Sequence, residues 1–304
     1  MDLFVILPLI YKKLNFQSEK KMEYKDYKVF KIKVQGGVAW VTIDNPPVNL
    51  INSLFWEDMV RFFDEVKTDD DIRVIVFQSA DPEIFISHYD VSALTEFPEE
   101  TGPKPTELQG WKKEFIDFRT LPKVTIAKIE GIVGGGGNEF CLSLDMRFGA
   151  IGKAVFSQGE AAVGILPGGG GTHWLTRLMG RSRALEAMLS LMPYSAETAE
   201  RYGWINRALP ADKIGPFVER LAYSIAYVPA ETIALIKKCV VAAEELPRKE
   251  SLLEESYLFA IAASLPESKK RMNQALKSGL QTREAELGPK KRLEELEKLL
   301  GERD

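Results

Sequence analysis

The first part of the chain alternates hydrophobic and polar positions and then changes to a helical period. Tyr27 to Val34 and Val38 to Ile43 alternate, are rich in β-branched and aromatic residues, and are separated by Gly36-Gly37, which predicts a β-hairpin. Asn45-Pro46-Pro47 ends the second strand. After Ser53 the apolar residues recur at helical spacing, so a helix is predicted to follow.

Short apolar runs predict further strands in the middle of the chain. The runs are Arg73 to Gln78, Val124 to Ile129 and Arg147 to Ile151, and a helical pattern around Trp111 to Phe118 precedes the second of them. Strands that alternate with helices are typical of α/β folds.

Beyond about residue 215 only helices are predicted. They are Phe217 to Ala226, Glu231 to Glu245, Ser251 to Ala263, Ser268 to Lys277, and a last charged helix that Gly288-Pro289 opens. In this last helix four leucines form a narrow apolar stripe: Leu293, Leu296, Leu299 and Leu300. The stripe either contacts another subunit or lies against its own chain, because an apolar stripe must bury against something.

The chain is therefore divided into an N-terminal extension (1–22), a core (23–214) and a helical C-terminal region (215–304). The extension carries the apolar run Leu3 to Ile10, which is shorter than the roughly 20 residues of a spanning helix. The run is a hook for a membrane or a partner, a disordered extension, or the product of translation begun upstream of Met22, and we expect one of the last two. We expect no membrane span and a cytoplasmic location.

Composition narrows the classes of function. Lys and Arg number 40 against 44 Asp and Glu, and this weak negative balance argues against nucleic acid as a partner. The two cysteines, Cys141 and Cys239, match no disulfide framework, redox motif or zinc motif, which indicates a reducing compartment. With only His88 and His173 available, a multi-histidine metal centre is excluded.

The densest anomaly is the run Gly134 to Gly137, followed by Asn138 and Glu139, directly after a predicted strand. Glycine lets the backbone turn sharply and approach a ligand without a Cβ in the way. The helix that follows directs free N–H groups at that ligand. The run lacks the Gly-Lys-Ser/Thr of a phosphate loop and the last glycine of G-x-G-x-x-G, so neither motif explains it.

Two glutamates accompany two glycine runs. Glu139 lies in the first turn of the predicted helix, and Glu160 is followed by the second run, Gly168 to Gly171, which opens another helix. Such a pair suits general acid/base work on an activated carbonyl. The alternative is that Glu139 only complements the helix dipole and that Glu160 is a solvated loop residue.

A third segment, Phe85 to Asp90, comes after the strand predicted at Arg73 to Gln78. Asp90 is predicted to cap the next short helix. His88 has two interpretations, a functional group or a loop histidine without a role.

Together these segments resemble the enoyl-CoA hydratase/isomerase (crotonase) superfamily, from about Tyr27 to Gly279. Five pieces occur in the family's order. They are Asn45-Pro46-Pro47-Val48-Asn49, an early turn; Phe85 to Asp90, for F-x-x-G-A-D; Glu130 to Glu139, for N-G-x-x-x-G-G-G-x-E; Phe156 to Glu160 with Gly164 to Thr172, for F-x-x-P-E and G-x-x-P-G-x-G-G-T; and Ala196 to Pro210, for A-x-x-A-x-x-x-G-L-V-x-x-x-x-P.

The resemblance implies an α/β fold, a crotonase-like spiral of ββα turns with a helical C-terminal oligomerisation region that builds homotrimers or dimers of trimers. It implies an acyl-CoA thioester as substrate, fatty acid metabolism, and no metal or other cofactor. By position, the backbone N–H groups of Tyr89 and Gly136 form the oxyanion hole, and Glu139 and Glu160 are catalytic. The implied substrate-binding residues are His88, Asp90, Gly135, Pro167 and Gly168.

Four positions depart from the family pattern, and one of them is Ser92, where the family often has a basic residue. His88 replaces a glycine, Tyr89 a small residue, and Gly159 the proline before Glu160. The oxyanion hole is still expected, because a backbone N–H is present with any of these side chains. The Tyr89 ring either narrows the acyl pocket or packs elsewhere. His88 is an extra acid/base, a CoA contact or inert, and we favour the last two; Gly159 adds backbone freedom that could loosen Glu160.

The leading hypothesis is an enoyl-CoA hydratase that adds water syn across a 2-enoyl-CoA thioester, because Glu139 and Glu160 are both present. The alternatives are another reaction of the superfamily (isomerisation, retro-aldol cleavage or decarboxylation of an acyl-CoA) and a non-catalytic acyl-CoA-binding protein. Fold alone does not separate reactions that share one enolate.

Overall fold

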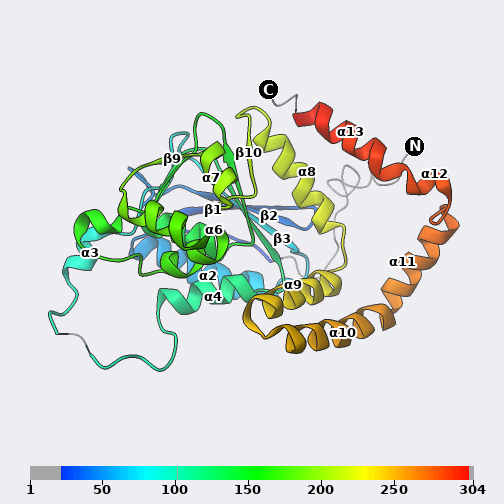
Figure 1. Ribbon diagram of the computed structural model, residues 1–304, viewed down its shortest axis with the longest axis horizontal. Helices are drawn as coiled ribbons and strands as arrows, with labels where there is room; N and C mark the ends of the chain where they lie inside the picture. The colour runs from blue at the N-terminus through cyan, green and yellow to red at the C-terminus, as the bar shows by residue number, and fades with distance from the viewer. Residues whose placement is uncertain (1–21, 101, 301–304) are drawn as a thin grey trace.

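The computed structural model describes residues 22–100 and 102–300, which form two β-sheets with helices on their faces and at one end (Figure 1). The apolar run Leu3 to Ile10 and nearly all of the predicted extension lie outside the described residues. Among the helices that are described, none has the length and apolar character needed to cross a bilayer.

The larger sheet has six strands, and its edge is the predicted hairpin. The strand order is β1 (Phe30–Gln35), β2 (Val38–Ile43), β3 (Val74–Ser79), β5 (Val124–Ile129), β7 (Met146–Ala150) and β10 (Arg207–Leu209). The first two strands are antiparallel and every other neighbouring pair is parallel. The hairpin and the three predicted internal strands are thus confirmed.

Both faces of this sheet are buried, which explains why its internal strands read as continuous apolar runs. In β3, Ile75 and Phe77 belong to the main core, on the face that also buries apolar residues of α2 (Ser53–Thr68). Val74 and Val76 point to the opposite face and pack in a second core with α8 (Ile214–Ala226). The side-chain period of two therefore divides one strand between two cores.

The smaller sheet has the order β4 (Ile84–Ile86), β6 (Ile132–Gly134), β8 (Val155–Ser157) and β9 (Tyr194–Ser195). The pairs β4–β6 and β6–β8 are parallel, and β9 is antiparallel to β8. None of these strands exceeds three residues. Parallel pairing brings the carboxyl ends of β4, β6 and β8 to one edge.

Helices of 4 to 19 residues lie between and after these strands in the chain. They are α3 (Val91–Thr95), α4 (Trp111–Thr120), α5 (Gly135–Ser143), the 3₁₀ turn η1 (Glu160–Val163), α6 (Gly171–Leu189) and α7 (Ala196–Tyr202). The Asp90 side chain accepts a hydrogen bond from the Ser92 N–H, 3.0 Å away, and so the predicted cap of α3 is confirmed.

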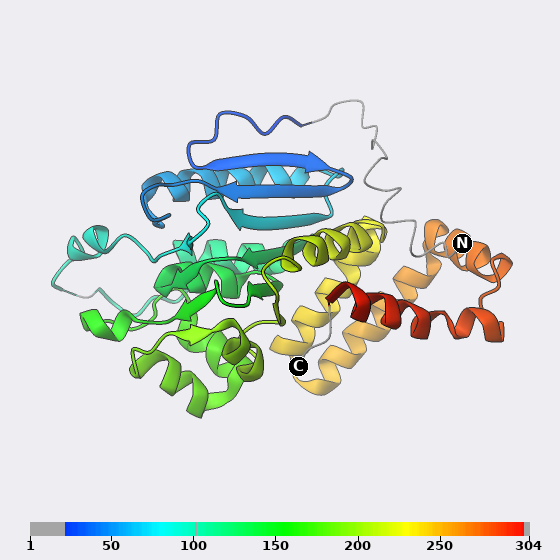
Figure 2. The same ribbon diagram turned by 90° about the horizontal axis from the view of Figure 1, so that it is seen from above.

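The C-terminal region is helical, and no described residue after β10 lies in a strand. It continues from α8 with α9 (Ala230–Glu245), α10 (Arg248–Ser264), α11 (Pro266–Lys277), α12 (Arg283–Glu286) and α13 (Gly288–Leu300). Two views show α10 to α13 extending to one side of the sheets (Figures 1 and 2). In the leucine stripe of α13, Leu296 packs against the second core, whereas Leu293 is 53% exposed. The three-part division of the chain stays a prediction.

A buried lysine ties α9 to the core. The Lys237 ammonium donates to the backbone oxygen of Lys123 and to the Asp145 carboxylate, each 2.8 Å away. Asp145 also accepts from the Thr125 N–H at 2.8 Å. Burial lowers the pKa of Lys237, so the charged form depends on these partners.

We expect Lys237→Met to lower the free energy of unfolding by about 3 kcal/mol, because it leaves the Asp145 charge without its cation in a mostly buried place. Urea unfolding at neutral pH measures the change. The matched control is Lys238→Met, since Lys238 is exposed and pairs with Glu254 at 2.7 Å on the surface. Its expected cost is much smaller, because an exposed ion pair contributes little to stability. Equal costs for the two variants would contradict the anchoring role.

Candidate active site

Three chain segments meet at the carboxyl edge of the smaller sheet. β4 leads into His88 and Tyr89, β6 into the glycines that begin α5, and β8 into Gln158 and Glu160. Because the three strands are parallel neighbours, segments up to about 70 residues apart in sequence are placed side by side.

The loop after β4 is fixed by a bridge to the segment that precedes α2. The Ile51 N–H donates to the His88 carbonyl at 3.0 Å, and the Asp90 N–H donates to the Ile51 carbonyl at 3.0 Å. In this parallel pattern the N–H of Tyr89, between the two bonded residues, points away from Ile51. The bridge therefore turns the Tyr89 N–H toward the other side of the loop.

Gly136 lies on that other side. A Cβ built on Gly136 would be 3.2 Å from the Tyr89 nitrogen and 2.9 Å from its Cβ, so only glycine permits this approach. Gly136 is the second residue of α5, and the first N–H groups of a helix have no partner inside the helix. The two backbone N–H groups predicted to form an oxyanion hole are thus neighbours.

Asn49 supports the same loop from the Pro-Pro turn. Its amide nitrogen donates to Ser79 Oγ at 2.9 Å and to the Phe85 carbonyl at 3.1 Å. The residue is buried and has φ = 49°, a conformation that asparagine tolerates better than most residues. The sequence motif marked this turn, but only the fold reveals that its asparagine positions the loop after β4.

Glu139 is buried in the first turns of α5, with 3% of its surface exposed. Its Oε1 accepts the N–H of Gly169 at 2.7 Å and that of Gly171 at 2.8 Å. Burial raises the pKa of Glu139 to about 7, aided by the charge of Glu160 and opposed by the two N–H donors. A carboxyl group with such a pKa can both give and take a proton near neutral pH.

Glu160 begins the 3₁₀ turn after β8. Its Oε1 accepts the side-chain amide of Gln158 at 2.7 Å. Its Oε2 is buried and accepts no hydrogen bond from the described part of the chain. Burial raises the pKa of Glu160, against the Gln158 donor and the nearby His88, which lower it. The two predicted glutamates are close enough for the charge of Glu160 to contribute to the raised pKa of Glu139.

Several predicted substrate-binding residues lie around the glutamates. A Cβ on Gly135 would be 3.4 Å from His88 Cβ and 3.5 Å from Glu160 Oε1, which places Gly135 between the two. The exposed His88 ring places its Nδ1 within hydrogen-bond distance of the Tyr89 carbonyl oxygen, 2.7 Å away. Gly159, the other departure from the family pattern, has φ = −98°, a backbone conformation open to any residue.

The remaining predicted residues lie at the edges of the site. A Cβ on Gly171 would approach Pro167 Cβ to 2.8 Å and Glu139 Oε1 to 3.0 Å, so Pro167 packs behind the turn that holds Glu139. The Asp90 carboxylate is occupied with capping α3, and the hydroxyl of Ser92 lowers its pKa. Substrate binding by these residues stays a prediction.

Trp111 is part of this region and was missed by the sequence analysis. The Tyr89 ring packs edge-on against Trp111, with ring centroids 4.6 Å apart. Trp111 also lies 3.5 Å from where a Cβ of Gly168 would be. Of the two alternatives for the Tyr89 ring, narrowing the acyl pocket or packing elsewhere, the structure shows where it packs. The ring forms an aromatic wall with Trp111 that reaches the second glycine turn.

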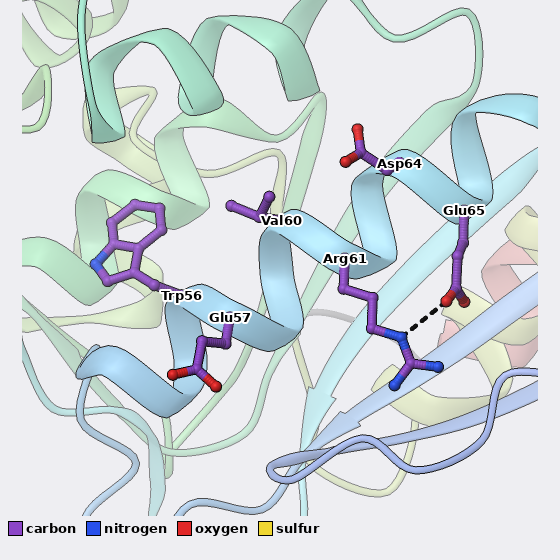
Figure 3. A pocket seen from close by; sticks show the side chains of 6 residues that line it. All are labelled: Trp56, Glu57, Val60, Arg61, Asp64 and Glu65. Atoms are coloured by element: carbon purple, nitrogen blue, oxygen red, sulfur yellow. Dashed lines mark hydrogen bonds and ion pairs between the residues drawn. The ribbon is translucent and has the colours of Figure 1, made fainter.

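A separate groove runs along the outer side of α2 (Figure 3). Trp56 and Val60 supply its apolar part, and the Arg61–Glu65 ion pair, 2.8 Å long, closes one end. None of the predicted site residues lines it.

The family model described as enoyl-CoA hydratase/isomerase matches residues 33–282, most of the chain. The chain belongs to this family. Its crotonase fold and its standing as an enzyme follow from that membership.

Relatives agree with this assignment. The short-chain-enoyl-CoA hydratase of Clostridium acetobutylicum is 28% identical over 242 residues, which is 79% of this chain and 92% of the relative. The probable enoyl-CoA hydratase, mitochondrial, of Dictyostelium discoideum is 27% identical over 84% of this chain and 91% of its own. A candidate enoyl-CoA hydratase from Streptomyces avermitilis, known from its crystal structure, is 39% identical in sequence with a TM-score of 0.65. The match covers 84% of this chain and 94% of that one.

We expect Gly169→Ala to lower kcat on an enoyl thioester at least about tenfold, because its Cβ would lie 2.7 Å from Glu139 Oε2 and displace the carboxylate while keeping the N–H donor. Steady-state rates and circular dichroism measure activity and folding.

The matched control is Gly159→Ala, whose Cβ meets nothing within 4 Å. It should keep kcat within about twofold of wild type. A Gly169→Ala enzyme with full activity would show that the position of Glu139 does not matter.

Proposed function

We propose that the enzyme is an enoyl-CoA hydratase, which adds water syn across the double bond of a 2-enoyl-CoA thioester. One observation carries the proposal: the buried Glu139 and the half-buried Glu160, both with raised pKa values, stand beside two neighbouring backbone N–H groups. The enoyl-CoA hydratase names of its relatives favour the same reaction within the family.

In the proposed mechanism the N–H groups of Tyr89 and Gly136 donate to the thioester oxygen. Negative charge grows on that oxygen when water attacks the β-carbon, and fixed donors stabilise it in the transition state. One glutamate takes the proton that water loses as its oxygen bonds to the β-carbon. The other glutamate gives a proton to the α-carbon, which converts the enolate into the 3-hydroxyacyl product.

Hydration has no net change of oxidation state and so needs no redox cofactor, and because the two N–H groups stabilise the oxyanion, the proposal includes no metal. Coenzyme A enters as part of the substrate.

The test is the loss of the conjugated enoyl-thioester absorbance with crotonyl-CoA and longer 2-enoyl-CoA substrates, together with the product mass. We expect a product heavier by one water, and Glu139→Gln and Glu160→Gln should each lower kcat about 100-fold or more. A product of unchanged mass would indicate isomerisation. No turnover of any chain length, or full activity of either variant, would refute the two-glutamate hydratase.

We further propose that the chain self-associates into homotrimers or pairs of trimers through its C-terminal helices. Large apolar side chains on α10 support this, because Tyr257 is 64% and Phe259 72% exposed in the single chain. Light scattering should give three or six chain masses for wild type and a smaller mass for Phe259→Lys. A monomeric wild-type protein at micromolar concentration would contradict the proposal.

A further inference from the structure

We propose that Trp204 and Asn138 are positioning residues that act through Gln158 and fix which side of its amide faces Glu160. The proposal rests on the proposed hydratase function only for its kinetic readout. Of the three residues, only Gln158 bonds Glu160 directly; Asn138 bonds Gln158, and Trp204, which lies 66 residues beyond Asn138 in the sequence, bonds Asn138.

A continuous chain of side-chain hydrogen bonds leads to Glu160. The Trp204 indole Nε1–H donates to Asn138 Oδ1 at 2.8 Å. The Asn138 Nδ2 donates to Gln158 Oε1, and the Gln158 Nε2 donates to Glu160 Oε1 at 2.7 Å. Gln158 Nε2 also donates to the Gly135 carbonyl at 3.3 Å.

The direction of this chain is set at Trp204. An indole N–H donates and never accepts, so the oxygen of Asn138 must face it. The Asn138 amide nitrogen then faces Gln158, so the Gln158 side-chain oxygen must accept the hydrogen bond. The Gln158 nitrogen is left for Glu160, and each amide in the chain has only one orientation that satisfies its neighbour.

Burial makes this direction costly to reverse. Trp204 and Asn138 are fully buried, and Gln158 is 1% exposed. In such surroundings hydrogen bonds strengthen one another, and an unsatisfied polar group is expensive. The Trp204 ring is itself held by Phe156 and Tyr194, with ring centroids 5.9 and 5.7 Å away.

The fixed orientation of the Gln158 amide affects the protonation of Glu160. With Gln158 as donor, Oε1 is held as an acceptor, and the buried Oε2 is left to carry the proton. If Gln158 flipped, its oxygen would face the carboxylate and disfavour the ionised form. The other titratable groups that act on the Glu139 and Glu160 carboxyls are His88, on the loop after β4, and Lys112, on α4.

The kinetic test compares Gln158→Met, Trp204→Phe and the double variant. Gln158→Met removes the donor to Glu160 and should lower kcat about 10- to 100-fold with KM within about threefold. Trp204→Phe keeps the ring but removes the indole N–H, and should lower kcat about 3- to 10-fold. In both variants the limb of the pH profile that belongs to Glu160 should move to higher pH.

The double variant separates a relay from independent damage. If Trp204 acts through Gln158, Trp204→Phe should cost kcat almost nothing more once Gln158 is Met. Multiplicative losses would overturn the proposal. The control is Tyr194→Phe, which alters a buried ring that packs against Trp204. The Tyr194 hydroxyl lies 3.3 Å from the Ser190 hydroxyl, which is not part of the hydrogen-bond chain to Glu160, so this variant should leave the pH profile unchanged.

A readout without turnover keeps the two proposals distinct. The Glu160 carboxyl is titrated by ¹³C NMR in Glu139→Gln backgrounds, which removes the coupled second carboxyl. Its titration should move to higher pH in Gln158→Met, in Trp204→Phe and in Asn138→Leu, which provides a second route if Trp204→Phe does not fold. An unchanged titration would overturn the relay but leave the hydratase proposal intact. A shifted titration in a protein that hydrates no enoyl thioester would support the relay and refute the hydratase proposal.

Discussion

The parallel pairing of β4, β6 and β8 is the constraint on which the site depends. Parallel neighbours end at the same edge, so the loop carrying Tyr89, the start of α5 and the segment carrying Glu160 are brought together there. Each strand has only three residues, and therefore the loops are held mainly by what surrounds them. Asn49 and the Ile51 bridge provide that support on one side.

The second theme is how the site holds two carboxyl groups, one buried and one half-buried, close to each other. Burial raises both pKa values, and hydrogen-bond donors partly offset it. Glu139 receives two backbone donors from the glycine turn before α6, whereas Glu160 receives a side-chain donor from Gln158. The backbone donors are fixed by the turn, but a side-chain amide can rotate, which is why Gln158 needs partners of its own.

Much of this arrangement could be predicted from the sequence. The hairpin, the internal strands of the larger sheet and the C-terminal helices have long periodic signals, and the glycine runs and glutamates form contiguous motifs. The smaller sheet has no such signal, because two or three residues show no period. Trp111 and Trp204 were missed for another reason: each reaches the site through tertiary packing with residues distant in sequence.

The most direct test of the account is a crystal structure with a saturated acyl-CoA, which binds as a thioester but has no double bond to hydrate. The account predicts the thioester oxygen at about 2.7–3.1 Å from both the Tyr89 and Gly136 nitrogens. It also predicts the α- and β-carbons between Glu139 and Glu160. A thioester oxygen held by any other pair of groups, or an acyl chain bound away from the glutamates, would contradict it.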